Sequence, residues 1–258
     1  MSIIRLLAVT WWLQLKIRSR SAFDGLLTLV YPMFFATSIF MVFQHGDASG
    51  AALTSAAVGA SALGIWSAVS TTAAFTFQLE RFQGTLELLV LSPRPFGLLL
   101  VPITLSMATI GVYSMAATLL WGRFGFGIAI HFADPVLFVL AVLATVLSIA
   151  LLGMLLAVCS VRYRAAWALG AAVEMPIWLL CGFVVAVDDL PAWIRPLSAV
   201  LAPTWGMAAV RAATQGDPVG GDIAVCLLIA AAYGLAGVLI ARWTLNSARA
   251  HATLALTA

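Results

Sequence analysis

The sequence predicts an all-α, polytopic membrane protein with six transmembrane helices preceded by an interfacial amphipathic helix. The 258 residues are 63% apolar and only 9% charged, against roughly 45–50% and about 25% in soluble domains. The mean hydropathy of +1.08 indicates that lipid rather than water is the main solvent. So few charges cannot cover a soluble surface, and intrinsic disorder needs the opposite composition. The pI near 9.0 reflects scarce acids rather than a basic patch, which argues against nucleic-acid binding.

Six apolar stretches are long enough to cross a hydrocarbon core, which takes about 20 helical residues. The segments between them are short, so residues 1–258 are expected to form a single transmembrane domain. No small-residue cleavage site follows the first stretch before the span is complete, so we interpret it as a span rather than a signal peptide. The predicted transmembrane helices are 25–44, 52–77, 96–121, 135–159, 166–187 and 222–243.

The placement of Lys and Arg sets the orientation of such a chain. With the N-terminus inside, only Arg123, Arg195 and Arg211 lie outside, whereas most of the acids do. We therefore expect a multi-pass protein of the cell (cytoplasmic) membrane with both termini cytoplasmic. The basic residues expected on the inner side are Arg5, Lys16, Arg18, Arg20, Arg81, Arg94, Arg162, Arg164, Arg242 and Arg249.

Residues 3–20 differ from the spans that follow them. Leu7, Trp11 and Leu15 recur at helical spacing, whereas Lys16 lies off that stripe. Tryptophan rings favour the headgroup region, so the pattern predicts a helix lying along the inner leaflet. The alternative is a short lead-in to the first span with snorkelling basic side chains.

The inner loop 78–95 carries more structure than a connection between two spans needs. Thr85 can cap a short helix, and Glu87 favours its positive N-terminal end. Leu86 and Leu89 give that helix an apolar face, and Pro93 ends it because proline lacks an amide hydrogen. A short amphipathic helix of this kind suits a cleft in a cytoplasmic partner.

This loop resembles the pattern of ABC-2 type transporter permeases, among them drug-resistance permeases of the daunorubicin type and lipo-oligosaccharide export permeases. Glu80-Arg81, Gly84-Thr85-Leu86-Glu87 and Leu91-Ser92-Pro93 carry the resemblance. It implies a coupling helix over 79–92 that docks on a separate ATPase (nucleotide-binding) subunit. Phe82 stands where the family often has an acid. The residues expected to couple to the ATPase are Glu80, Arg81, Gly84, Thr85, Leu86 and Glu87.

The outer segment 190–212 also resembles the family, which has short helices there that dip into the outer leaflet and close the pathway. Cys181-Gly182 stands where many members have Ser-Gly. Apart from the resemblance, the segment is too apolar for a water-exposed loop, and a backbone break at membrane depth needs shelter by protein. An aromatic collar at the outer interface is the alternative. The resemblance makes Trp193, Pro203 and Trp205 the outer gate candidates.

Glu174 is the acid that lies deep within a predicted span. A lone carboxylate is costly there, so it should be neutral, paired or facing a wet cavity. Its role is open between a residue of the substrate path and a polar contact between helices or across a dimer. The glycines Gly59, Gly64, Gly111 and Gly153 are expected to allow close approach of helices.

No catalytic, metal-binding or cofactor-binding residues are predicted. No His-Glu-x-x-His, Gly-x-Ser-x-Gly or Walker pattern is present. Cys159, Cys181 and Cys226 lie in apolar runs and are expected to be buried free thiols. If ATP drives the protein, ATP and Mg²⁺ must bind on another polypeptide.

The function expected from the resemblance is that of the membrane permease subunit of an ATP-driven exporter, which is not itself an ATPase. Its cargo would be a hydrophobic drug or antibiotic, a lipid or a lipid-linked sugar. The expected partners are separate ABC ATPase subunits, a second permease copy or paralogue, and membrane lipids. The alternative is an ATP-independent secondary transporter or channel, although such proteins usually carry several intramembrane acids or broken helices.

The predicted orientation places Asp47 and Arg94 on opposite sides of the membrane. Single cysteines introduced by Asp47→Cys and Arg94→Cys should therefore react with an impermeant maleimide from opposite sides. Labelling of both from the same side would refute the orientation.

Overall fold

The computed structural model describes residues 3–19, 22–46, 50–82, 96–128, 132–162 and 174–251. These residues are helical apart from short turns, and residues 174–180 form one of the helical segments. The other helices are α1 (Ile3–Ser19), α2 (Ala22–His45), α3 (Gly50–Phe82), α5 (Phe96–Gly125), α6 (Pro135–Arg162), the short η1 (Val187–Asp189), α8 (Arg195–Val200), α9 (Ala202–Gln215) and α10 (Gly220–His251).

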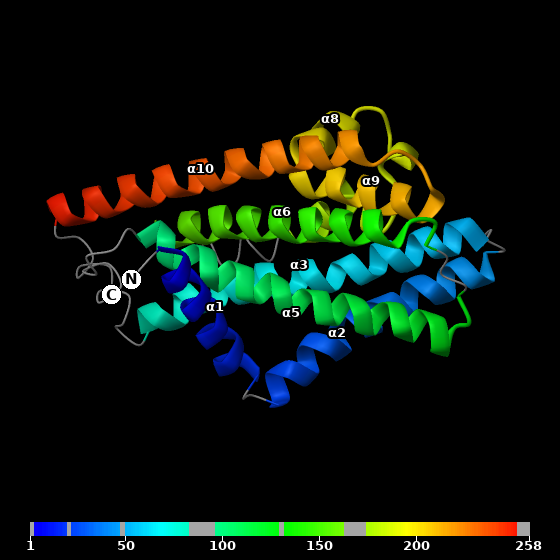
Figure 1. The fold of residues 1–258 in the computed structure, drawn as a ribbon, viewed down its shortest axis with the longest axis horizontal. Helices are drawn as coiled ribbons and strands as arrows, with labels where there is room; N and C mark the ends of the chain where they lie inside the picture. The colour runs from blue at the N-terminus through cyan, green and yellow to red at the C-terminus, as the bar shows by residue number, and fades with distance from the viewer. Residues whose placement is uncertain are drawn as a thin grey trace.

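The long helices α3, α5, α6 and α10 run lengthwise, and the short α8 and α9 gather at one end (Figure 1). α3 packs against α2, α5 and α6, and α6 packs in turn against α9 and α10. The beginning of α1 and the end of α10 lie toward the other end. We call the end with α8 and α9 the outer end, following the orientation predicted from the basic residues.

Within the described residues, four stretches are long and apolar enough to cross a membrane: Ala52–Val69, Val101–Gly125, Pro135–Leu156 and Gly220–Trp243. The apolar part of α2, Leu29–His45, is shorter. The predicted span 166–187 is described only from residue 174. Six spans therefore remain a prediction.

α1 packs along α5. The half-buried Trp11 donates a hydrogen bond from its indole Nε1 to Thr109 Oγ1 of α5 at 3.2 Å. Apolar side chains also cover the opposite side of α1, where Trp12 is 63% and Ile17 57% exposed. The predicted stripe thus faces protein, and the location of α1 at the inner interface stays a prediction.

Glycines bring the helices close together, as the sequence predicts. A Cβ placed on Gly111 of α5 would lie 2.6 Å from the Cα of Ile65 in α3, and one on Gly64 would lie 2.5 Å from Ser114 Oγ. One on Gly153 of α6 would lie 2.5 Å from a methyl group of Val69. Each distance is shorter than carbon contacts allow, so these positions require glycine at this helix spacing.

Large apolar side chains remain exposed along the outside of the bundle. Leu228 and Leu235 of α10 are 73% and 63% exposed, and Phe34 of α2 is 68% exposed. Exposed patches of this kind on a soluble protein would mark an interaction site. On a helix that spans a bilayer, they suit lipid chains or another subunit.

Gly111→Ala should destabilise the protein. The added methyl group meets the backbone of Ile65 rather than a flexible side chain, and overpacking of this kind costs about 1–3 kcal/mol. Gly221→Ala in α10 is the matched control, because nothing lies within 4 Å of its added Cβ. Thermal unfolding in detergent should show a lower Tm for the first variant alone. Equal Tm values would mean that α3 and α5 separate at little cost.

Candidate functional site: the outer turn and its buried arginine

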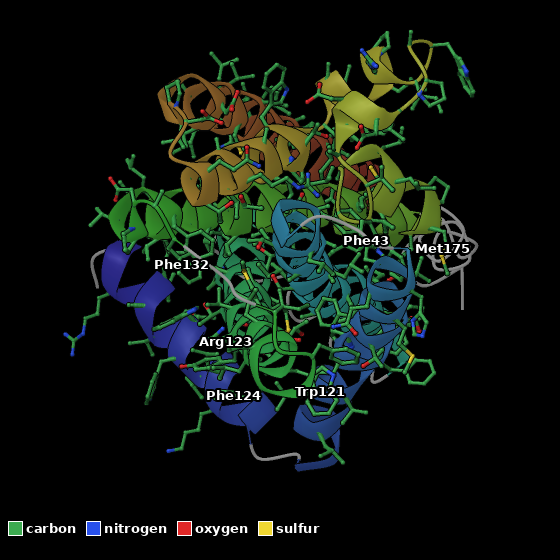
Figure 2. All side chains as sticks on the ribbon, turned by 90° about the vertical axis from the view of Figure 1, so that its right-hand side faces the viewer. Phe43, Trp121, Arg123, Phe124, Phe132 and Met175 are labelled. Carbon is green, nitrogen blue, oxygen red and sulfur yellow. The ribbon has the colours of Figure 1, made fainter. Side chains whose placement is uncertain are left out.

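The outer end is built from the segment that joins residues 174–180 to α10. After residue 180 the chain turns at Cys181–Phe183, forms η1 and α8, bends, and returns as α9. Figure 2 looks onto this end, where Phe43 of α2 and Trp121, Arg123 and Phe124 of α5 also lie. The turn at Cys181–Phe183, which we call the outer turn, organises the site.

The outer turn lies beside the middle of a candidate span rather than beyond its end. Phe183 is fully buried, and its ring centroid lies 6.3 Å from that of Trp66 in α3. A Cβ on Gly59 would overlap the carbonyl oxygen of Phe183. Gly59 and Trp66 both belong to the candidate span Ala52–Val69. The helical segment 174–180 therefore ends well inside the bundle.

A glycine cap ends that helical segment. Gly182 has a left-handed φ of +74°. Its amide donates to the carbonyl of Leu179 at 3.1 Å, and the amide of Phe183 donates to that of Trp178 at 3.0 Å. These two bonds form the Schellman motif, which satisfies helix-terminal carbonyls that would otherwise lack a donor. A side chain at Gly182 would strain this backbone.

Two side chains of α9 satisfy further carbonyls at the outer turn. Arg211 Nη2 donates to the carbonyl of Gly182, and Thr204 Oγ1 donates to that of Leu180 at 3.3 Å. Backbone groups this far from water cost free energy when they are left unpaired. α9 thus completes the hydrogen bonding of the segment that it packs against.

Arg211 occupies space that two glycines leave open. A Cβ on Gly59 would lie 3.0 Å from Arg211 Nη2, and one on Gly182 would lie 3.2 Å from Nη1. Asp188 and Asp189 of η1 interact electrostatically with the guanidinium, which stays charged in proteins. Its Nε has no hydrogen-bond partner among the described residues. The guanidinium therefore joins α3, the outer turn and α9 through one bond to a carbonyl and acidic neighbours.

Other contacts hold the remainder of the outer segment. Arg195 of α8 donates from Nε to Leu190 O at 3.0 Å and from Nη2 to Asp188 O at 2.7 Å. Tyr233 of α10 donates its hydroxyl to Val200 O at 2.6 Å. This second contact ties the bend between α8 and α9 to the last long helix.

The three gate candidates from the sequence occupy different environments. Trp193 is 75% exposed, whereas Pro203 is buried in the first turn of α9. Trp205 is half-buried and donates from Nε1 to Ala199 O at 2.9 Å. No hydrogen bond or ring contact joins Trp193 to the other two in the described part of the chain. Pro203 and Trp205 therefore lie at the bend between α8 and α9, and Trp193 is exposed apart from them.

Sequence reasoning missed the residues at the centre of this site. Arg211 was counted only as an outer base of the family segment, and Phe183 was not singled out. A usable signal existed, because Thr204 and Arg211 are two turns apart on one face of α9, and the residues between them on that face, Met207 and Ala208, are apolar.

The predicted coupling residues lie mostly outside the described residues. Glu80 and Arg81 belong to the last turn of α3, whose side chains are not described there. Gly84, Thr85, Leu86 and Glu87 fall within 83–95, which is not described. α3 itself continues to Phe82, directly before this loop.

Glu174 is half-buried at the start of the described helical segment 174–180. Its buried Oε1 has no hydrogen-bond partner among the described residues. The carboxylate interacts electrostatically with Tyr31 of α2.

The described residues contain no group of three or more His, Cys, Asp and Glu side chains that could hold a metal ion. Cys181 and Cys226 are buried free thiols, as predicted. Cys159 is exposed on the surface of α6, so that prediction is wrong for this position. Apolar sequence does not distinguish an inward from a lipid-facing side of such a helix.

Arg211→Met should loosen the outer turn, because it removes a charged hydrogen bond of about 1.5–3 kcal/mol from a buried carbonyl. Cys181, which is 0% exposed, reports the effect. In a Cys159→Ala background, maleimide labelling of Cys181 should accelerate by roughly tenfold or more. Arg123→Met, which changes an exposed outer arginine, should leave labelling slow. Equally slow labelling in Arg211→Met would show that other contacts hold the turn.

A family model for the ABC-2 type transporter matches residues 5–214. The matched region runs from α1 nearly to the end of α9, and it includes both the inner loop and the outer turn. A comparison with curated proteins gives no significant match. Since most of the sequence is matched, the chain belongs to the ABC-2 type transporter family, whose domains form the membrane-spanning permease component of ABC transporters rather than the ATPase.

Proposed function

We propose that this permease is the membrane half of an ATP-driven exporter for hydrophobic cargo. The observation that carries the proposal is the family match over residues 5–214, which contains the inner-loop motif and the outer segment together. The cargo class is a drug or antibiotic of the daunorubicin kind, a lipid or a lipid-linked sugar, as in the subfamilies that the sequence resembles. The long apolar helices, with few charges along them, are consistent with such cargo.

Two permeases, identical or paralogous, would pair above two separate ATPase subunits. ATP and Mg²⁺ bind on the ATPases in this proposal, and no cofactor binds on the permease. Both termini and the inner loop face the cytoplasm, where Glu80, Arg81, Gly84, Thr85, Leu86 and Glu87 contact the ATPase. The helix α3 supports this, because it continues to Phe82 and carries Glu80 and Arg81 directly before the loop.

The outer turn acts as the outer gate in this proposal, together with Pro203 and Trp205 and with Trp193 at its rim. The packing of Phe183 against Trp66 and the bond from Arg211 to Gly182 support a closed state. ATP binding shifts the equilibrium between this state and an open one only if the ATPase binds the two states with different affinity.

Charge reversal in the inner loop tests the coupling. Glu87→Arg should weaken co-purification with an ATPase encoded by a neighbouring gene by tenfold or more, because like or unpaired charges at an interface cost several kcal/mol. Asp217→Arg, on the predicted outer side, is the matched control and should leave association and ATP turnover unchanged. Association and turnover that survive Glu87→Arg would exclude this loop as the dock.

The same preparation decides against the alternative of a secondary transporter or channel. In inverted vesicles containing the complex, export should follow ATP and should persist when ion gradients are collapsed. Transport that continues without ATP and stops with the gradient would favour the alternative.

A further inference from the structure

An aromatic wall with one acid lies between α2 and the helical segment 174–180. Tyr31 and Phe35 are one turn apart on α2, with ring centroids 4.9 Å apart in an edge-to-face arrangement. Phe35 in turn lies 5.5 Å from the ring of Trp178 at an interplanar angle of 74°. Glu174 is one turn before Trp178, and its carboxylate interacts with Tyr31. The acid and the three rings therefore form one continuous chain of contacts, which is exposed at Tyr31 and buried at Trp178.

The polar atoms of this surface are not satisfied within the described protein. Glu174 Oε1 and the indole Nε1 of Trp178 are buried without a hydrogen-bond partner, and Trp66 Nε1 behind them is in the same state. Trp178 is only 5% exposed. A buried carboxylate without a partner is costly. Arg211 in the same molecule is the contrasting case, because its guanidinium donates a hydrogen bond to the carbonyl of Gly182. Among the residues that the structure describes, no basic side chain pairs with Glu174.

The wall is reached from the side of the bundle. Tyr31 is 44% exposed and Met175, next to Glu174, is 58% exposed. Figure 2 shows Met175 at the margin of the molecule. Tyr31 lies well below the end of α2 at His45, roughly 20 Å at 1.5 Å per residue. A compound dissolved in the hydrocarbon region can therefore reach this surface without crossing water.

We propose that Glu174, Tyr31, Phe35 and Trp178 form a binding site for a lipophilic organic cation. Aromatic faces attract cations, more strongly where water is excluded, and the carboxylate supplies the opposite charge. A delocalised or alkyl-shielded cation fits better than a small ammonium ion, because it enters an apolar medium at lower cost. This assignment narrows the cargo of the proposed exporter to lipophilic cations. That step from binding to transport rests on the proposed function.

The test uses the full-length permease in lipid nanodiscs and tetraphenylphosphonium as the probe. The isosteric anion tetraphenylborate is the control ligand. The wild-type protein should bind the cation saturably and the anion at least tenfold more weakly. Glu174→Gln should weaken cation binding by tenfold or more, Glu174→Asp should keep part of it, and Tyr31→Leu should weaken it several-fold. Asp222→Asn, which removes an acid from the first turn of α10, should bind like the wild type.

Equal binding of the two ions by the wild type would overturn the inference, and so would unchanged cation binding in Glu174→Gln. A third such outcome is a loss of cation binding in Glu174→Gln that is matched by a fall in Tm or in the mass of the permease dimer. The last would assign Glu174 to a contact between helices or subunits. The association test with Glu87→Arg is independent. If the complex hydrolyses ATP but does not bind the cation, the proposed cation site is wrong and the proposed function stands. If the permease binds the cation but recruits no ATPase, the proposed function is wrong and the cation site stands.

Discussion

The outer end depends on one constraint: a helix that stops inside an apolar bundle must have its free carbonyls bonded. Residues 174–180 end beside Gly59, so bulk water cannot complete their hydrogen bonds. The glycine cap at Gly182 provides donors for two of these carbonyls. Thr204 and Arg211 of α9 donate to two further carbonyls at the end of the helix and in the turn. The return of the chain as α9 is thus part of what allows the helix to end there.

Two charged residues, Arg211 and Glu174, differ in how the described structure balances their charges. Arg211 donates to a carbonyl and has two acids in range, and these interactions offset part of the cost of removing its charge from water. Glu174 has an unpaired oxygen among aromatic rings. A charge retained without a protein partner is expensive, and such groups in membranes most often serve a ligand, an ion or another subunit.

The sequence indicates much of the fold, because long apolar runs, basic residues and small residues each have a strong physical meaning in a membrane. The contacts of Gly64 and Gly111 follow directly from that reasoning. The position of the outer turn does not, since a largely apolar run continues from 166 to 187, and Gly182 by itself does not specify that the helix ends near 180. The sequence assigns Arg211 to the outer side because of the segment in which it lies. Only the structure shows that its side chain points inward and donates to the carbonyl of Gly182. The predicted coupling residues Gly84, Thr85, Leu86 and Glu87 lie outside the residues that the structure describes.

The bonds at the outer turn also bear on leakage. The charged bond from Arg211 and the bond from Thr204 together hold the turn by about 2–4 kcal/mol. At 1.4 kcal/mol per factor of ten, an unassisted opening that breaks only these two bonds would be populated in roughly one molecule in thirty to one in a thousand. In the proposed exporter, these two bonds would keep the outer turn closed in most molecules while the ATPase is idle.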